Sequence, residues 1–459
     1  MDFLAILVLS STVMAGFAAL CVLLKQVNVW FYETKLGEIR YSLPPGDLGW
    51  PLIGTMWSFL RAFKSGDPDS FISSYVSRFN RTGIYKAFMF GSPTIMITIP
   101  ETCKQVLMDD EHFMPGWPKS TCKLIGRKSF VGISREEHRW LRRLTAAPVN
   151  GDEALSTYLE FIEGAVISAL EKWAGMGKIQ FLTELRRLTF RIITYIFLSS
   201  EGDPARKKLV KILQSAVTER RVRMAKNAPR AKKDMMDALI EVEDDRGKRL
   251  TDEEIIDVLI MYLNAGHESS GHITTWATIF IQEHPEVLKK AKAEQEEIIR
   301  NRSPTQKGLT LKEVRQMEYL SKVIDETLRC INISPVVFRQ ATSDFKINGY
   351  IIPKGWKVQV WFRSVHMDPE VYLEPKKFNP ARWDGYTPKA GTFIPFGAGN
   401  RLCPGNDLAK MEISIFLHYF LLGYQLKRLN PECPVRYLPH PRPTDNCLAI
   451  LTKVSSQSM

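Results

Sequence analysis

The 459-residue chain has few cysteines, and none of the seven forms a C-x-x-C pair. They stand at positions 21, 103, 122, 330, 403, 433 and 447. An odd and scattered set argues against a disulfide framework and against a structural zinc site. It favours a reducing compartment.

Other signals are also missing. No G-x-G-x-x-G lies between a strand pattern and a helix pattern, so we expect that the chain does not bind NADPH itself. No repeat or low-complexity tract interrupts it. The formal net charge is +12, but Lys and Arg are spread along the chain and no nucleic-acid motif accompanies them. We therefore expect no nucleic acid partner, and a basic face for an anionic membrane or an acidic protein.

The first uncharged run, from Phe3 to Leu24, is long enough to span a bilayer as a helix. A cleavable signal peptide is the alternative, but no Lys or Arg precedes the run and it exceeds the usual length. Lys25, Lys35 and Arg40 follow, which predicts a single-pass anchor with the rest of the chain in the cytosol.

Three regions are predicted along the chain. Residues 1–25 form the anchor, 26–54 a linker with a stiff Pro44-Pro45 hinge, and 55–459 the catalytic domain. Periodicity predicts helices over 151–173, 180–198, 207–223, 234–243, 251–284, 285–301, 318–332 and from 406 to 421. Alternation predicts β structure over 84–99 and over 345–360, where Asn348-Gly349 forms the turn. The predicted fold is mainly α with minor β.

The most informative motif surrounds Cys403, in the run from Phe396 through Gly399 and Arg401 to Gly405. Glycines let the backbone turn closely about a sulfur, and Arg401 suits an anionic group such as a haem propionate. A buried structural cysteine in a Gly-rich turn is the alternative.

The pattern Phe-x-x-Gly-x-Arg-x-Cys-x-Gly resembles the haem-ligand loop of the cytochrome P450 family, the haem-thiolate monooxygenases. The resemblance implies a cytochrome P450 fold with haem b, the Cys403 thiolate as axial iron ligand, and Phe396, Gly399, Arg401 and Gly405 as cofactor-binding positions.

A second motif is Glu326-Thr327-Leu328-Arg329, whose Glu and Arg lie on one helix face. An ordinary surface pair is the alternative. The later Phe378-Asn379-Pro380-Ala381-Arg382 completes a motif order that resembles the same family. That resemblance implies a buried network of Glu326, Arg329 and Arg382.

A third motif, from Ala265 and Gly266 to Glu268 and Ser269, lies inside the long helix predicted over 251–284. Glycine at a helix centre costs about 1 kcal/mol, and small residues there leave room for a flat cofactor. A helix kink with solvated polar residues is the alternative. The family has Thr in most members where this chain has Ser269. The resemblance implies that Glu268 and Ser269 deliver protons to bound O₂.

Three further residues match propionate-binding positions by resemblance only: His138, which replaces a Trp, Arg142 and Arg339. Each alone would be read as an ordinary polar side chain.

The stretches 43–51, 145–151 and 443–449 resemble plant ent-kaurenoic acid oxidases. This implies stepwise oxidation of a diterpenoid acid towards gibberellin precursors. It also implies an endoplasmic reticulum membrane location, membrane lipid contact, and electrons from an NADPH-cytochrome reductase. A triterpenoid or steroid oxidase of the same fold is the alternative.

One region departs from the resemblance. Residues 202–234 leave room for little more than one basic helix, where the family has two helices and a loop over the substrate pocket. About thirty residues are missing by comparison with the fold. We therefore expect an intact haem site under an open pocket, and a haem-binding isoform with impaired catalysis remains a further alternative.

Overall fold

The computed structural model describes residues 3–126, 128–198, 206–226, 234–385 and 387–454. The chain forms two units, Met1–Pro118 with Val336–Val365, and Lys119–Pro335 with His366–Met459. The sequence predicted one domain from residue 55. The division arises because strands late in the sequence return to pair with strands of the first hundred residues.

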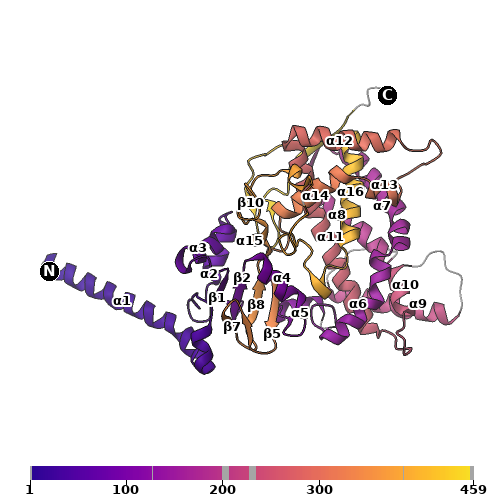
Figure 1. Ribbon diagram of the computed structural model, residues 1–459. Coiled ribbons are helices and arrows are strands. Elements are labelled where there is room, and N and C mark those ends of the chain that lie inside the picture. The colour runs from indigo at the N-terminus through magenta and orange to yellow at the C-terminus, as the bar shows by residue number, and fades with distance from the viewer. Residues whose placement is uncertain (1–2, 127, 199–205, 227–233, 386, 455–459) are drawn as a thin grey trace. The chain divides into compact units, whose positions relative to one another are not determined.

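The first unit holds a five-stranded sheet in the order β1-β2-β8-β5-β3, in which β2 and β8 are parallel (Figure 1). Its helices are α1 (Phe3–Tyr32), η1 (Thr34–Ser42), α2 (Met56–Lys64), α3 (Asp69–Phe79) and α4 (Pro100–Met108). Its strands are β1 (Ile84–Met89), β2 (Ser92–Ile97), β3 (Phe113–Pro115), β5 (Val337–Ala341), β6 (Phe345–Ile347), β7 (Tyr350–Ile352) and β8 (Lys357–Val360).

The second unit is mostly helical. Its helices are α5 (Lys119–Ile125), α6 (Arg135–Asn150), α7 (Asp152–Ala174), α8 (Phe181–Leu198), α9 (Arg206–Ala225), α10 (Met235–Glu241), α11 (Asp252–Glu283), α12 (Pro285–Arg300), α13 (Leu311–Arg315), α14 (Glu318–Cys330), η2 (Pro380–Trp383), η3 (Gly399–Arg401) and α16 (Asn406–Gly423). Its strands are β4 (Lys178–Gln180), β9 (Tyr424–Arg428), β10 (Val435–Arg436), β11 (Arg442–Pro443) and β12 (Leu448–Lys453). Helix α15 (Phe362–His366) spans the point where the chain passes between units.

The predicted mainly helical fold with minor sheet is confirmed, and the predicted helices of the second unit agree with the observed ones within two residues. Both predicted hairpins form. In the second, Asn348 and Gly349 have φ of 49° and 82°, the left-handed pair that a tight hairpin turn requires.

The first helix is longer than the predicted anchor. Helix α1 continues to Tyr32, so residues 26–32 are helical instead of being part of the linker. The reason is that no glycine or proline follows Lys25 before Tyr32, so nothing in the sequence ends the helix at the charge. Residues Ser11–Tyr32 are apolar enough to cross a membrane.

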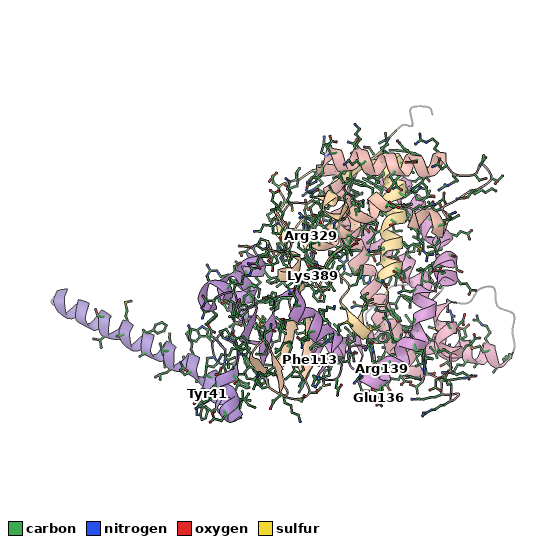
Figure 2. All side chains as sticks on the ribbon, viewed as in Figure 1. Tyr41, Phe113, Glu136, Arg139, Arg329 and Lys389 are labelled. Carbon is green, nitrogen blue, oxygen red and sulfur yellow. The ribbon has the colours of Figure 1, made fainter. Side chains whose placement is uncertain are left out.

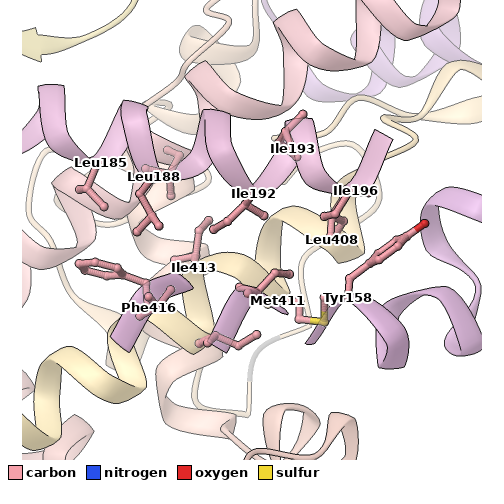
Figure 3. Packing of buried hydrophobic residues seen from close by; sticks show 14 of the residues in the cluster. Tyr158, Leu185, Leu188, Ile192, Ile193, Ile196, Leu408, Met411, Ile413 and Phe416 are labelled. Atoms are coloured by element: carbon pink, nitrogen blue, oxygen red, sulfur yellow. The ribbon is translucent and has the colours of Figure 1, made fainter. Parts of the chain in front are cut away.

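The core of the second unit is built on α11, which packs against α8, α14 and α16. Figure 3 shows the apolar residues of α8 meeting those of α16. Leu185, Leu188, Ile192 and Ile196 recur at three- and four-residue spacing and so line one face of α8. Thr251 and Glu254 form a reciprocal capping box that fixes where α11 begins.

Between α8 and α10, the described residues contain one helix, α9. The predicted short region 202–234 includes 202–205 and 227–233, which lie outside the described residues. Arg220 of α9 pairs with Asp234 and Asp237 at 2.6 and 2.9 Å, and Arg221 pairs with Asp252 at 2.9 Å. Helix α9 is therefore joined to α10 and to the start of α11. In the middle of α11, Asn264 and Ala265 are exposed.

Glu412 on α16 is a carboxylic acid buried in this core. It is 4% exposed, and its two oxygens have no hydrogen-bond partner of ordinary geometry among the described residues. The Ser270 hydroxyl is the polar group nearby. Burial raises the pKa of Glu412 to about 8, and Ser270 opposes the rise only weakly. The side chain is thus held neutral at physiological pH.

We expect Glu412→Gln to stabilise the protein increasingly as pH rises. A carboxyl with a higher pKa in the native state favours folding below its unfolded-state pKa and loses that contribution as pH rises towards 8. The advantage of the variant should grow by about 1 kcal/mol per pH unit between pH 5 and 8. Urea unfolding at both pH values measures it, and a constant difference would contradict the expectation.

Candidate active site

The loop that carries Cys403 is closed by its own backbone. The Cys403 amide donates to the Phe396 carbonyl at 2.9 Å, and the Gly397 amide donates to Ile394 at 3.0 Å. Gly397 and Gly399 have φ of 81° and 70°, values that side-chain-bearing residues rarely adopt. Because α16 starts at Asn406, the sulfur lies just before a helix N-terminus.

Two opposing effects act on the Cys403 thiol. Burial raises its pKa, while the Gly405 amide and then the positive charge of Arg142 lower it. Amide groups at a helix start and a nearby guanidinium both favour a thiolate. The surroundings therefore contain the groups that a sulfur needs in order to act as an anionic ligand.

Phe130 connects the sequence-predicted residues of this region. Its carbonyl accepts from Arg401 at 3.3 Å, and its ring lies 5.3 Å from that of the buried His138. The ring of Tyr262, on α11, is 6.0 Å from Phe130, and the Tyr262 hydroxyl donates to Thr145 at 3.1 Å. The Cys403 loop, α6 and α11 thus meet around one aromatic side chain.

At the centre of α11, Gly266 lies against α8 and its neighbour Ala265 is exposed. A Cβ on Gly266 would lie 2.9 Å from the end of the Ile193 side chain on α8, so a larger residue here would require that side chain to shift. A role of these two small residues towards a cofactor stays a prediction.

The predicted relay residues make different contacts. Ser269 donates to the Ala265 carbonyl at 2.7 Å, and Glu268 pairs with Arg186 of α8 at 2.8 Å. Thr189, also on α8, donates to the His267 carbonyl at 2.6 Å. Hydroxyls that bond to helix carbonyls compete with the helical hydrogen bonds and loosen them locally. Glu268 is half-buried, and its partner Arg186 was not found from the sequence.

Glu326, Arg329 and Arg382 are brought together. The two carboxylate oxygens of Glu326 accept from Arg329 at 2.8 and 2.9 Å, and one also accepts from Arg382 at 3.3 Å. The Trp383 ring nitrogen and the Asn379 amide donate to the same carboxylate, at 3.1 and 3.0 Å. Glu326 and Arg329 are fully buried, and Figure 2 labels Arg329 within the second unit.

The network reaches towards the cysteine loop through a histidine. Arg329 donates to the His366 carbonyl at 2.9 Å. The His366 ring lies 2.6 Å from the Asn332 side-chain oxygen through Nδ1, and its Nε2 accepts from the Ile394 amide at 3.0 Å. Ile394 begins the turn that precedes Phe396, so one connected set of polar contacts supports the loop.

Arg339 lies in the first unit, on β5. It is 5% exposed and donates to the Phe338 carbonyl at 3.3 Å. A Cβ on Gly116 would meet the Arg339 backbone at 2.0 Å, so the paired strand needs glycine there. The role of Arg339 as a propionate ligand stays a prediction.

Sequence reasoning missed Phe130, Tyr262, Arg186, Trp383 and Glu412. Trp383 had an available signal, because it directly follows Arg382 in the quoted motif. The others join segments far apart in the chain, and no spacing pattern marks them.

The residues of the second unit fit a haem-thiolate group. The Cys403 sulfur receives the Gly405 amide and lies near the positive charge of Arg142, and Arg401 belongs to the same loop. Among the described residues no cluster of three or more His, Cys, Asp or Glu offers a different metal site. A lone thiolate with nearby cations suits a haem iron and its carboxylates.

Comparison with known proteins defines the class. A model of the cytochrome P450 family matches residues 200–441, and the chain belongs to this family of haem-thiolate monooxygenases. Cyanobacterial CYP120A1 with bound retinoic acid has the same fold, with a TM-score of 0.80 and 25% identity over 90% of this chain and 99% of that one.

Particular relatives are more similar. Ent-kaurenoic acid oxidase 2 of Arabidopsis thaliana is 60% identical over 96% of this chain and 97% of its own length. The ent-kaurenoic acid oxidase of Oryza sativa is 57% identical over 98% and 96%. A 7,8-epoxymelianol synthase of Ailanthus altissima is 51% identical over 98% and 96%.

The Arabidopsis comparison also reveals a shortening. It runs over 474 positions but includes 96% of the 459-residue chain, about 441 residues, so about 33 positions have no counterpart here. The difference agrees in size with the thirty residues that the fold comparison predicts to be missing.

We expect Glu326→Gln to destabilise the protein by about 3–5 kcal/mol, because the buried Arg329 guanidinium and the partly buried Arg382 guanidinium lose their carboxylate. Asp152→Asn is the control, since Asp152 and its partner Arg315 are 72% and 56% exposed. The control should change the stability much less, because solvent screens an exposed pair. Urea unfolding of both variants checks this, and equal effects would contradict a structural role of the network.

Proposed function

We propose that the protein oxidises ent-kaurenoic acid in successive steps towards gibberellin precursors, as a monooxygenase with haem b. Identity of 57–60% to ent-kaurenoic acid oxidases over almost the whole chain carries the proposal. The cysteine loop and its buried charge network supply the physical support.

Each site residue has a part in this proposal. Cys403 would hold the haem iron through its thiolate, and the haem would supply the chemistry that inserts one oxygen atom from O₂ into a C–H bond. Phe396, Gly399 and Gly405 shape the loop. The remaining cofactor contacts are Arg401, Arg142, His138 and Arg339 for the propionates, and Ala265 and Gly266 for the opposite face.

Proton delivery is assigned to Glu268 and Ser269. The Ser269 hydroxyl bonds to Ala265, on the exposed part of α11, while Glu268 pairs with Arg186. In this scheme Glu268 takes up a proton from water and the Ser269 hydroxyl passes it on. Arg186 is a positioning residue in this scheme.

Electrons come from a separate NADPH-cytochrome reductase. Arg135, Arg139 and Arg143 of α6 are exposed, and α6 also carries Arg142, which acts on the Cys403 thiol. Figure 2 labels Arg139 on this helix. An acidic flavoprotein would find on α6 a basic surface close to the sulfur.

The N-terminal helix α1 anchors the protein in the endoplasmic reticulum membrane, with the remainder in the cytosol. Its apolar segment and the following Lys25, Lys35 and Arg40 support this orientation.

A second candidate keeps the haem site but changes the substrate. Relatives named 7,8-epoxymelianol synthase are 49–51% identical, so similar chains carry names for other products. This favours a triterpenoid or steroid as the alternative substrate class.

The shortened segment bears on activity. We place the missing positions in the segment that contains α9, since the described residues hold one helix between α8 and α10. Asn264 and Ala265, in the middle of α11, are exposed. An open pocket should bind substrate weakly, which keeps a haem-binding isoform with impaired catalysis as a third candidate.

Reconstitution with a plant reductase, NADPH and ent-kaurenoic acid tests the proposal. We expect gibberellin precursors, and a weaker substrate-induced Soret shift than that of the Arabidopsis relative. Turnover of larger terpenoids alone would favour the second candidate. A normal CO spectrum without any turnover would favour the third. Cys403→Ala is the control, and it should lose the thiolate-type CO spectrum while keeping its helical content.

We expect Ser269→Ala to reduce product formed per NADPH by about 10²-fold, the usual contribution of a positioned proton-transfer group. The CO spectrum should be unchanged, because Ser269 does not touch Cys403 or its loop. Ser269→Thr keeps the hydroxyl and should retain most of the coupling. Unchanged coupling in the alanine variant would remove Ser269 from the relay.

A further inference from the structure

Helix α11 is buried along most of its length, with one break in its middle. Residues 255–263 and 270–279 are all buried, whereas residues 264–269 are exposed or partly exposed. The break contains the two residues that are assigned to proton delivery, and it begins with the exposed Asn264. A ligand that reaches α11 at this break therefore meets Asn264 and the proton-delivery pair on one short stretch of helix.

Asn264 is a polar residue that follows an apolar stretch. The six residues before it, 258–263, are apolar or aromatic and are 9% exposed or less. Asparagine inside a helix is unfavourable compared with leucine or methionine, because its amide competes for backbone hydrogen bonds. Among the described residues, the Asn264 side chain has no hydrogen-bond partner. Its amide thus keeps a donor and an acceptor available at a position where folding alone would favour an apolar residue.

Asn264 lies one helical turn before Glu268. The four-residue spacing places the two side chains on one face, about 6 Å apart along the helix axis. Glu268 is already engaged by Arg186 at 2.8 Å, whereas the Asn264 amide is available. A ligand group that is hydrogen-bonded to Asn264 is therefore held within about one helical turn of the proton-delivery residues.

Stepwise oxidation requires that an intermediate stays bound. In the first step, one oxygen atom of O₂ enters a C–H bond and forms an alcohol. The other oxygen atom leaves as water with two protons and two electrons from the reductase. The alcohol must then remain in the site, or bind again, before the next oxidation. A site with a hydrogen-bonding partner for the new hydroxyl group distinguishes the alcohol from the unoxidised substrate.

We propose that Asn264 hydrogen-bonds to the hydroxyl group formed in the first oxidation and retains the alcohol for the next step. The inference rests on the proposed function. Asn264 is a specificity-determining residue that acts on the intermediate, because its amide can both donate to a hydroxyl and accept from it. This role also gives a reason for a polar side chain in the middle of α11.

The test compares the full chain with its Asn264→Leu variant, which should fold because leucine has a similar size and a higher helix propensity. The ligands are ent-kaurenoic acid and the alcohol isolated from a short reaction of the Arabidopsis thaliana relative with that acid. Soret titration of each haem-loaded protein measures both dissociation constants. We expect the Kd of the alcohol to rise about tenfold, the effect of one lost hydrogen bond, and that of ent-kaurenoic acid to change less than about twofold.

Turnover with a plant reductase and NADPH gives a second readout. We expect the Asn264→Leu variant to accumulate the alcohol, whereas the unchanged chain forms further oxidised products. Asn264→Gln retains an amide and should bind the alcohol more tightly than Asn264→Leu does. Asn301→Leu is the control, since Asn301 is an exposed asparagine at the end of α12, and it should match the unchanged chain in both readouts.

The outcomes separate the inference from the proposed function. Equal weakening of both ligands would mean that Asn264 contacts a part common to them, such as the carboxylate, and would overturn the inference. Unchanged binding of the alcohol, or unchanged proportions of the later products, would also overturn it. If neither chain turns over ent-kaurenoic acid but the variant still binds the alcohol about tenfold more weakly, the proposed function is wrong and the hydroxyl contact of Asn264 is confirmed.

Discussion

The ion pair between Glu326 and Arg329 is the interaction on which the catalytic unit depends most. Both side chains are fully buried, so neither charge is tolerable without the other. The carboxylate accepts from Arg382, Trp383 and the Asn379 amide as well. The guanidinium donates to the carbonyls of His366, Pro375 and Lys377. This one pair thereby holds the segment from His366 to Trp383, which has little regular structure, in place. His366 in turn accepts a hydrogen bond from the Ile394 amide.

The geometry of the cysteine loop depends on the contacts that join Arg329 to Ile394 through His366, and on the start of α16. Left-handed glycines turn the backbone around the sulfur, and the helix start supplies amide groups. Burial alone would keep Cys403 protonated, whereas the Gly405 amide and Arg142 act in the opposite direction. Burial is the largest of these effects and the pKa of Cys403 stays raised, so the amide and the guanidinium reduce that rise without reversing it.

The sequence predicted most of the helices because they are long and carry strong periodicity, as α7 and α11 do. It also predicted which residues form the charge network, because their order along the chain resembles a known family. It did not predict that Gly266 packs against Ile193 or that Glu268 pairs with Arg186. Both facts depend on how α8 crosses α11, and a spacing pattern within one helix carries no information about the helix beside it. The length of α1 was underestimated because the charge at Lys25 was taken as the end of the anchor helix. No glycine or proline follows before Tyr32, and the helix continues to that residue.

The contacts also explain why a shortened segment near α9 is compatible with an intact sulfur site. The polar partners of the network lie between Glu326 and Ile394, and the groups acting on the Cys403 thiol come from α6 and the α16 N-terminus. Helix α9 pairs instead with Asp234 and Asp237 around α10 and with Asp252 at the start of α11. A change in that segment therefore affects contacts around α10 and at the start of α11, without removing a contact from the cysteine loop. The contacts of α9 and those of the cysteine loop thus involve separate residues of this chain.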